Sequence, residues 1–281
     1  MSRPRLDVRN LRGRLALVTG AASGIGRASA LALARRAATL AICDVNEAGL
    51  SETEVAARAL GVDVLARRVD VARAEDVLGF ADQVHARFAA VDLLMNNAGV
   101  GLGGGFLDTS LEDWRWIVDI NLMGVVHGCH AFVPKMVASG RGGHVVNVAS
   151  MAGYVASSTL PAYVATKFAV LGLSEALREE LAPHGIGVTA LCPGIIHTPI
   201  VTSSRMRGPA ASDAARAQMA RAFARRNYPP ERVAENMLRA VQRNRAVAPI
   251  SPEAWSFYYL KRFAPSVVRW IGAQVAKRQP S

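Results

Sequence analysis

The sequence of 281 residues contains little cysteine. Its three cysteines, Cys43, Cys129 and Cys192, lie far apart and in apolar segments. Their number and spacing exclude a disulfide framework and a cysteine metal site, and they predict buried free thiols in a reducing compartment. His127 and His130 stand three residues apart with no third ligand nearby, so we expect no bound metal.

Long apolar runs are also absent. No stretch of about 18 apolar residues occurs, and the first 20 residues lack the apolar segment of a signal peptide. We therefore expect a cytoplasmic protein without a spanning helix. The sequence shows no linker and no internal repeat, and its length fits one large domain or two small ones.

Acidic residues are scarce only in the last third of the chain. Residues 1–199 hold 18 Lys or Arg and 18 Asp or Glu, whereas residues 200–281 hold 15 and 4. The formal net charge of +11 thus belongs to the C-terminal part. A basic protein invites a nucleic-acid interpretation, but a neutral body with a basic end argues against one.

Short apolar runs alternate with amphipathic segments over more than 200 residues. The amphipathic segments predict helices over 46–60, 73–90 and 162–183 and two more within 110–139. This alternation predicts an α/β fold, a doubly wound parallel sheet of about seven strands with helices on both faces. The expected strands cover residues 15–20, 38–45, 62–71, 91–99, 142–150, 186–194 and 245–250.

A glycine turn follows the first expected strand. Gly20, Gly24 and Gly26 allow close backbone approach, and the next helix would offer free N–H groups to a pyrophosphate. Such a turn alone could equally be a bare tight turn. Asp44 strengthens the phosphate interpretation, because a carboxylate after the second strand can bind ribose hydroxyls and repels a 2′-phosphate. It favours NAD over NADP, although a helix N-cap would also explain Asp44.

A tyrosine and a lysine stand four residues apart in "YVATK". On a helix, Tyr163 and Lys167 would be neighbours. Alone, this pair would usually be a surface accident. A phenol has a pKa near 10, and a nearby ammonium group together with the positive nicotinamide ring of NAD⁺ would lower it toward the range of a useful general base.

These motifs occur in the order found in the short-chain dehydrogenase/reductase superfamily, which the chain resembles over residues 12–250. The motifs are "TGAASGIG" at 19–26, "DV" at 70–71, "NNAG" at 96–99, Asn121 in "DINLMG", Ser150 in "VVNVAS", "YVATK" at 163–167 and "PG" at 193–194. The resemblance implies an NAD(P)-dependent oxidoreductase that interconverts a secondary alcohol and a ketone by hydride transfer, a reaction on CH–OH donors.

The resemblance also implies a role for each matching residue. Tyr163 would be the general acid/base, Lys167 would support it, Ser150 would bind the substrate oxygen and Asn121 would join Lys167 to solvent through a water. The cofactor would contact Gly20, Ser23, Gly24, Ile25, Gly26, Asp44, Asp70, Val71, Asn97, Ala98, Gly99, Tyr163, Lys167, Pro193, Gly194, Ile196 and Thr198.

Residues 1–250 are expected to form one Rossmann-like domain whose substrate lid covers about 195–228. The lid would be a helical segment that orders on binding or a solvated loop; Met206, Met219 and Phe223 could face a hydrophobic substrate. Residues 251–281 form a basic, aromatic extension, expected to be helical. It would pack on the body or a partner subunit, or contact a membrane peripherally; nucleic acid ranks last.

The sequence is compatible with two classes of function. One is an NAD-linked dehydrogenase, with an NADPH-dependent carbonyl or ketoacyl-type reductase as the alternative within that class. The other is a non-catalytic dinucleotide-binding scaffold that docks to membranes through its tail. The resemblance further implies a homodimer or homotetramer with a small-molecule alcohol or ketone substrate.

Overall fold

A seven-stranded parallel sheet forms the centre of the protein. The computed structural model describes residues 6–277; residues 1–5 of the predicted domain and 278–281 of the predicted extension lie outside the described part. The strand order is β3-β2-β1-β4-β6-β7-β9, and every neighbouring pair is parallel. The strands are β1 (Leu15–Thr19), β2 (Thr39–Asp44), β3 (Val64–Arg68), β4 (Leu93–Asn96), β6 (Gly143–Val148), β7 (Ile186–Pro193) and β9 (Val247–Ile250).

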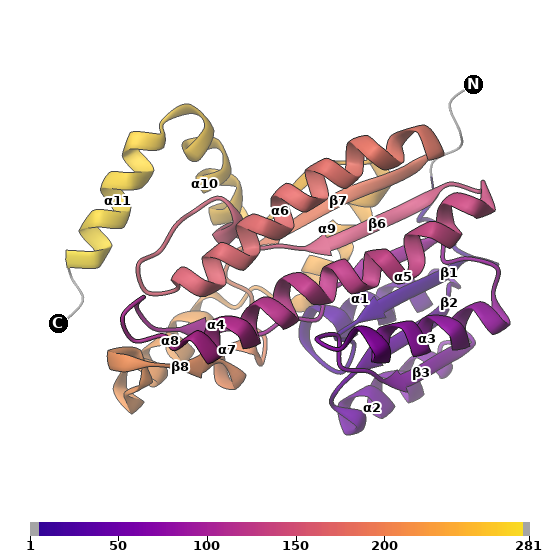
Figure 1. The fold of residues 1–281 in the computed structure, drawn as a ribbon, viewed down its shortest axis with the longest axis horizontal. Helices are drawn as coiled ribbons and strands as arrows, with labels where there is room; N and C mark the ends of the chain where they lie inside the picture. The colour runs from indigo at the N-terminus through magenta and orange to yellow at the C-terminus, as the bar shows by residue number, and fades with distance from the viewer. Residues whose placement is uncertain (1–5, 278–281) are drawn as a thin grey trace.

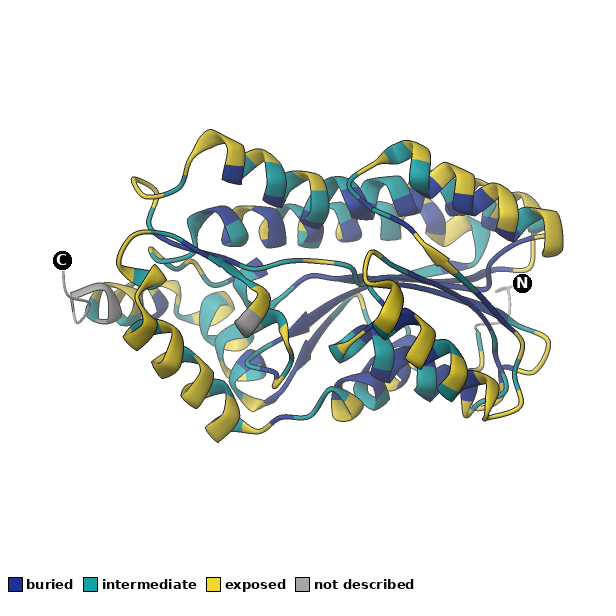
Figure 2. Cartoon of the chain, turned by 90° about the horizontal axis from the view of Figure 1, so that it is seen from below, coloured by how far each residue is buried: buried dark blue, intermediate teal, exposed yellow. Residues whose placement is uncertain are grey.

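Helices cover both faces of this sheet, which confirms the predicted doubly wound α/β fold (Figure 1). One face carries α1 (Gly24–Ala34), α2 (Glu47–Arg58) and α9 (Pro230–Gln242), and the other carries α3 (Ala74–Arg87), α5 (Gly124–Ser139) and α6 (Pro161–Leu181). Figure 2 shows the buried sheet between two helical layers whose outer surfaces are exposed. Because both faces are covered, strands such as β1 and β6 are buried at every position, and β1 is an apolar run up to its last residue.

The strand order reverses between β1 and β4, since β1 leads to β2 on one side and β4 leads to β6 on the other. In open parallel sheets, ligands bind at the carboxyl ends of the strands at such a point. The glycine turn after β1 and the "NNAG" segment after β4 both lie there.

A long helical stretch, Leu111–Ser139, crosses one face of the sheet. It consists of α4 (Leu111–Val118), a five-residue π-helical turn (Asp119–Met123) and α5, so the two predicted helices are continuous. By length and composition alone this stretch could cross a membrane, as the core helices of many globular proteins could. Here its buried side chains, including Phe132 and Met136, pack into the hydrophobic cluster below the sheet.

The predicted lid is only partly helical. It holds α7 (Ile200–Ser203), a strand β8 (Arg205–Met206), a short 3₁₀ turn (Gly208–Ala211) and α8 (Asp213–Arg226). The strand was not predicted: it pairs with β5 (Leu102–Gly103), which follows the "NNAG" segment. Side chains on only two residues cannot show an alternating pattern, so the sequence carries no signal for this pair.

The C-terminal extension folds into two helices, α10 (Pro252–Phe263) and α11 (Pro265–Lys277). They form a hairpin at the end of the molecule that also carries the lid (Figure 1). The base of α10 is fixed to the body, because Ala254 is fully buried and its carbonyl accepts a hydrogen bond of 2.7 Å from the Tyr154 hydroxyl. The three cysteines are free and buried, as predicted.

Candidate active site

Helix α6 places Tyr163 and Lys167 one turn apart on the same face. The Lys167 Nζ lies 5.7 Å from the centre of the Tyr163 ring. It donates a hydrogen bond of 2.9 Å to the carbonyl oxygen of Val148, the last residue of β6. The pair therefore sits at the carboxyl end of the sheet, where parallel sheets bind ligands, and not on the outer surface.

Ser150 joins this pair from the segment after β6. Its Oγ accepts a hydrogen bond of 3.1 Å from the Ala152 backbone N–H, which caps a short 3₁₀ turn. The same hydroxyl is hydrogen-bonded to the Tyr163 hydroxyl, and this contact acts to lower the pKa of Tyr163. Ser150 is thus both a turn cap and a direct neighbour of the phenol.

Asn121 lies at the centre of the π-helical turn and is fully buried. Its side chain accepts from the Val100 N–H at 2.8 Å and donates to the Val100 carbonyl at 3.0 Å. A Cβ atom on Gly99 would lie 3.2 Å from Asn121 Oδ1 and 3.6 Å from Lys167 Nζ, so both groups border this glycine. Single π-helical turns frequently mark functional sites.

Burial changes the acidity of the two titrating groups in opposite senses. It lowers the pKa of Lys167 from 10.5 to about 8, because the charged ammonium loses solvation. It raises the pKa of Tyr163, and the hydrogen bond with Ser150 only partly opposes this. In the protein alone, burial thus decides the direction of the Tyr163 pKa; the lowering expected from Lys167 together with the nicotinamide ring stays a prediction.

The glycine turn forms the start of α1. Its N-cap, Ser23, makes no side-chain capping hydrogen bond, so the first-turn N–H groups are not satisfied by a cap. Gly20 and Gly24 have φ values of +66° and +52°, a region that favours glycine. A Cβ on Gly26 would collide with the Gly20 carbonyl oxygen. These features make a cradle for an anion.

Asn97 ties the end of β4 to this turn. Its Nδ2 donates to the carbonyl oxygens of Thr19 at 2.9 Å and Gly20 at 3.0 Å. In return, the backbone N–H groups of Asn97 and Ala98 both donate to Thr19 Oγ1 at 3.0 Å. Thr19 was not among the predicted site residues, although its place at the end of β1 before the first glycine is a usable signal.

Asp44 ends β2 and faces the glycine turn. Its two carboxylate oxygens accept hydrogen bonds of 2.9 Å from the backbone N–H groups of Ala22 and Asn46. It does not cap α2, because the Asn46 side chain caps that helix through the Gly49 N–H. Each carboxylate oxygen keeps a lone pair that can accept from a ribose hydroxyl, so the residues present fit an adenosine ribose.

The next strand end supplies Asp70 and Val71. The Asp70 carboxylate accepts from the Ala72 N–H at 3.0 Å. The Val71 carbonyl lies 2.9 Å from His127 Nδ1, which agrees with the structural role expected of this histidine. Both residues stand at the carboxyl ends of the strands, beside the Asp44 edge of the sheet.

The segment after β7 closes the other side of the cradle. A Cβ on Gly24 would lie 3.2 Å from Thr198 Cγ2, which brings Thr198 against the glycine turn. Ile196 is buried in the core, and the preceding N–H, of Ile195, donates to Glu253 Oε1 at 3.0 Å. Sequence reasoning missed Glu253, although it is the one acidic residue within 251–281.

Two ion pairs anchor the lid, one before α8 and one at its end. Arg207 makes two hydrogen bonds, of 2.7 and 2.8 Å, to the buried carboxylate of Asp113 on α4. At the other end, Arg226 pairs with Glu253 at 2.7 Å. Of the three side chains expected to face a substrate, Met206 is buried on β8, but no residue of α8, which carries Met219 and Phe223, is buried.

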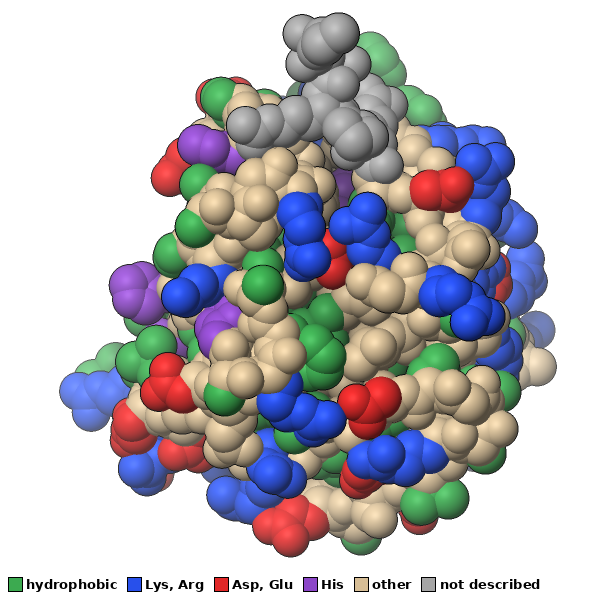
Figure 3. Space-filling view, turned by 90° about the vertical axis from the view of Figure 1, so that its right-hand side faces the viewer, with side chains coloured by type: hydrophobic (Ala, Val, Ile, Leu, Met, Phe, Trp, Pro, Cys, Tyr) green, Lys and Arg blue, Asp and Glu red, His purple; other side chains and the backbone are tan. Residues whose placement is uncertain are grey.

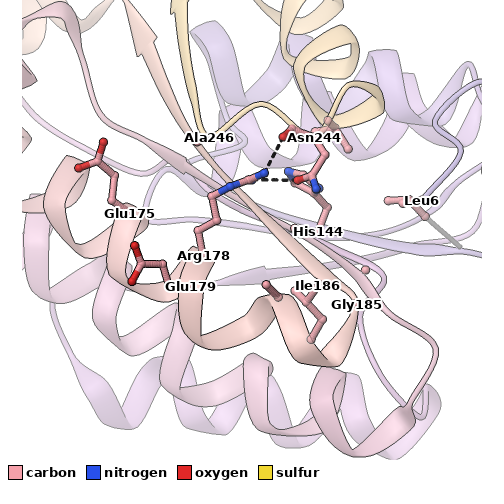
Figure 4. Close-up of a pocket in the computed structure, with 13 residues that line it drawn as sticks. Leu6, His144, Glu175, Arg178, Glu179, Gly185, Ile186, Asn244 and Ala246 are labelled. Carbon is pink, nitrogen blue, oxygen red and sulfur yellow. Dashed lines mark hydrogen bonds between the residues drawn. The ribbon is translucent and has the colours of Figure 1, made fainter. Parts of the chain in front are cut away.

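A separate pocket lies at the amino ends of β6 and β7, away from the predicted site at the carboxyl ends (Figure 4). Its lining includes Glu175, Arg178 and Asn244, and Arg178 donates to both the side chain and the carbonyl of Asn244. None of the predicted site residues lines it. The fold and the predicted residues therefore point to the carboxyl ends of the strands as the active site.

Comparisons with known proteins give the same family. The short chain dehydrogenase family model matches residues 14–207. EphD and SadH of Mycobacterium tuberculosis, both named as oxidoreductases, are 41% and 39% identical over 259 and 273 residues. The matches cover 91% and 95% of this chain; they span 97% of SadH but only 44% of EphD, so the chain is about half as long as EphD.

A solved structure gives the same family. The crystal structure of a short chain dehydrogenase/reductase from Burkholderia phymatum in complex with NAD superposes with a TM-score of 0.83. It is 32% identical, with 97% of this chain and 98% of that chain covered.

Proposed function

The chain belongs to the short-chain dehydrogenase/reductase family of oxidoreductases, and on that basis we propose that it interconverts a secondary alcohol and a ketone with NAD as cofactor. One observation carries the proposal. The Tyr163 phenol, the Ser150 hydroxyl and the Lys167 ammonium meet beside the glycine cradle, at the carboxyl end of β6. A general acid/base, an oxygen-binding donor and a buried cation are what proton transfer to or from an alcohol needs.

The cradle residues would hold the cofactor. The α1 N-terminus and its glycines suit the pyrophosphate, Asp44 suits the adenosine ribose hydroxyls, and Asp70 with Val71 suits the adenine. Thr198 and Ile196 would contact the nicotinamide carboxamide, and Asn97 with Ala98 and Gly99 would support the sheet edge under the adenosine ribose. When bound, the nicotinamide supplies the hydride acceptor or donor. Asp44 favours NAD; reduction of a carbonyl compound with NADPH is the alternative within the same site.

The protein's own residues would then move one proton. Tyr163 takes the proton of the alcohol when the substrate is oxidised, and returns it when a ketone is reduced. Ser150 donates a hydrogen bond to the substrate oxygen. Because burial raises the Tyr163 pKa, the phenolate needs positive charge close by, and the Lys167 ammonium supplies part of it. Asn121 holds the Gly99–Val100 backbone beside Lys167 and would join that group to solvent.

The substrate is proposed to be hydrophobic. Tyr163 packs against a cluster that contains Leu102 and Ile117, with Trp114 and Trp116 beside it. Apolar side chains around the reacting group favour an apolar carbon skeleton. By analogy with the family, we further propose that the protein is cytoplasmic and forms a homodimer or homotetramer. Residues 1–250 would form one domain.

The test is NADH formation from NAD⁺ and secondary alcohols of increasing chain length. We expect Tyr163→Phe to lower kcat about 10²- to 10⁴-fold and to leave NAD⁺ binding unchanged. Tyr259→Phe, which removes an exposed phenol on α10, is the matched control and should leave both unchanged. An equal loss of kcat in Tyr163→Phe and Tyr259→Phe, or undiminished turnover in Tyr163→Phe, would contradict the role of Tyr163 as the general acid/base. Binding of NAD⁺ without any turnover would favour the scaffold, and turnover with NADPH alone would favour the reductase.

A further inference from the structure

Helix α10 carries a ladder of stacked aromatic rings that leads away from the body. Trp255 stacks on Tyr259 with ring centres 5.7 Å apart, and Tyr259 stacks on Phe263 at 6.4 Å. The exposed fraction is 52% at Tyr259 and 80% at Phe263, at the tip of the hairpin. The rings stack on one another without being buried, so the tip presents an apolar surface.

Helix α11 adds two more exposed apolar side chains to the hairpin. Val267 is 41% and Trp270 is 63% exposed, and they follow Phe263 by four and seven residues. Val268 turns inward, at 6% exposure. Within the described residues, the hairpin thus carries four apolar side chains that the rest of the chain leaves exposed, here together called the hairpin face: Tyr259, Phe263, Val267 and Trp270.

Cations flank the hairpin face, and acids are absent from it. Lys261, Arg262 and Arg269 have no acidic partner among the described residues. In sequence, residues 254–281 hold five Lys or Arg and no Asp or Glu. The opposite end of the molecule is different, because acidic and basic side chains are interspersed there (Figure 3).

The positive charge around the hairpin face favours an anionic bilayer over a second copy of the chain as its binding partner. A second copy bound through the same face would bring two sets of like charges together, which opposes association. A bilayer with anionic headgroups complements the cations, and Trp and Tyr side chains prefer the depth at which headgroups meet the acyl chains. We propose that the hairpin face docks the protein on an anionic phospholipid bilayer.

The hairpin lies beside the active site. The base of α10 packs on the segment after Ser150 through the Tyr154–Ala254 hydrogen bond, and the hairpin and the lid occupy the same end of the molecule (Figure 1). Docking would place the mouth of the site close to the lipid. If the proposed function holds, the substrate class is then an alcohol or ketone dissolved in the bilayer, although docking itself does not depend on turnover.

Vesicle sedimentation with the full chain tests the docking. We expect the protein to pellet with vesicles of phosphatidylcholine and about 30% phosphatidylglycerol, to pellet poorly with phosphatidylcholine alone, and to be released by high salt. Lys261→Gln/Arg262→Gln/Arg269→Gln should lower the partition coefficient about 100-fold, since each cation near the surface contributes about fivefold. Arg12→Gln/Arg35→Gln/Arg243→Gln removes the same charge at exposed positions near the other strand ends, and should have little effect.

A second pair of variants tests the apolar contribution. Phe263→Ser/Trp270→Ser should weaken vesicle binding at least tenfold, whereas Val55→Ser/Leu107→Ser, at residues 65% and 98% exposed elsewhere, should not. Thermal unfolding verifies that each variant is folded.

Two outcomes would overturn the docking proposal. One is equal binding by the tail and control variants, which would place the contact elsewhere. The other combines two results: the wild-type protein does not bind anionic vesicles, and light scattering shows a smaller oligomer for Phe263→Ser/Trp270→Ser than for the wild type. Together these results would assign the hairpin face to contact with a second copy. NADH formation from a short, water-soluble alcohol, measured without vesicles, tests the proposed function separately.

Discussion

Replacing Lys167 by methionine should change how the stability of the protein depends on pH. Lys167 is 4% exposed, and burial lowers its pKa from 10.5 to about 8. Between these two pH values the unfolded chain holds a proton that the folded chain has lost, so the free energy of unfolding rises with pH. A shift of about 2.5 pKa units corresponds to about 3 kcal/mol. This contribution is complete above pH 10.5 and is lost as the pH falls through 8.

Equilibrium urea unfolding, followed by tryptophan fluorescence from pH 7 to 10.5, measures this contribution. The free energy of unfolding of the wild-type chain minus that of Lys167→Met should rise by about 3 kcal/mol across this range. Subtraction removes the titration of groups that both chains share. Lys135→Met, at an exposed lysine on α5, is the matched control and should give a flat difference.

A flat difference for Lys167→Met as well would refute the reasoning. It would mean that Lys167 keeps an ordinary pKa in the folded chain, and that its cost of burial is met by partners such as the Val148 carbonyl.

Three further substitutions test other parts of the site. Asp44→Ala should raise the Kd for NAD⁺ about tenfold or more, because hydrogen bonds to a charged group are lost; an unchanged Kd in a fluorescence titration would argue for the NADPH alternative. Gly26→Ala should destabilise the fold by about 1–3 kcal/mol in urea, since the added Cβ meets the Gly20 carbonyl; wild-type stability would show that the turn can relax. Asp113→Asn should cost about 1–3 kcal/mol at pH 7. Arg207 lowers the pKa of Asp113, so this difference should vanish as the pH falls below that lowered value, and a difference that persists in acid would exclude the ion pair as its source.

The sheet could be predicted because its strands are covered on both faces. A wholly buried strand such as Leu15–Thr19 needs an unbroken apolar run, and glycine or asparagine marks its end. The predicted catalytic residues are placed together for a related reason: Ser150 follows one strand end, and Tyr163 and Lys167 follow it on the next helix. Parallel strands bring these points to one edge of the sheet. The assigned roles remain predictions.

Other features could not be predicted, because they depend on contacts between distant segments. The pairing of Leu102–Gly103 with Arg205–Met206 joins residues about 100 positions apart through two-residue strands. The pKa of Tyr163 in the protein alone could not be predicted for a different reason: spacing shows that Lys167 is a neighbour, but burial decides the direction in which the pKa moves. The π-helical turn at Asn121 likewise leaves no mark in the apolar pattern.

Helix α8 is held by ion pairs near its two ends and not by buried side chains. Its entry is fixed by the Arg207–Asp113 pair and its exit by the Arg226–Glu253 pair, while none of its own residues is buried. Residues 214–225 can therefore be exchanged for another helix of equal length without uncovering the hydrophobic core or moving an ion pair. Such an exchange would leave Ser150, Tyr163 and Lys167 in place, because none of them lies on α8 or takes part in these two ion pairs.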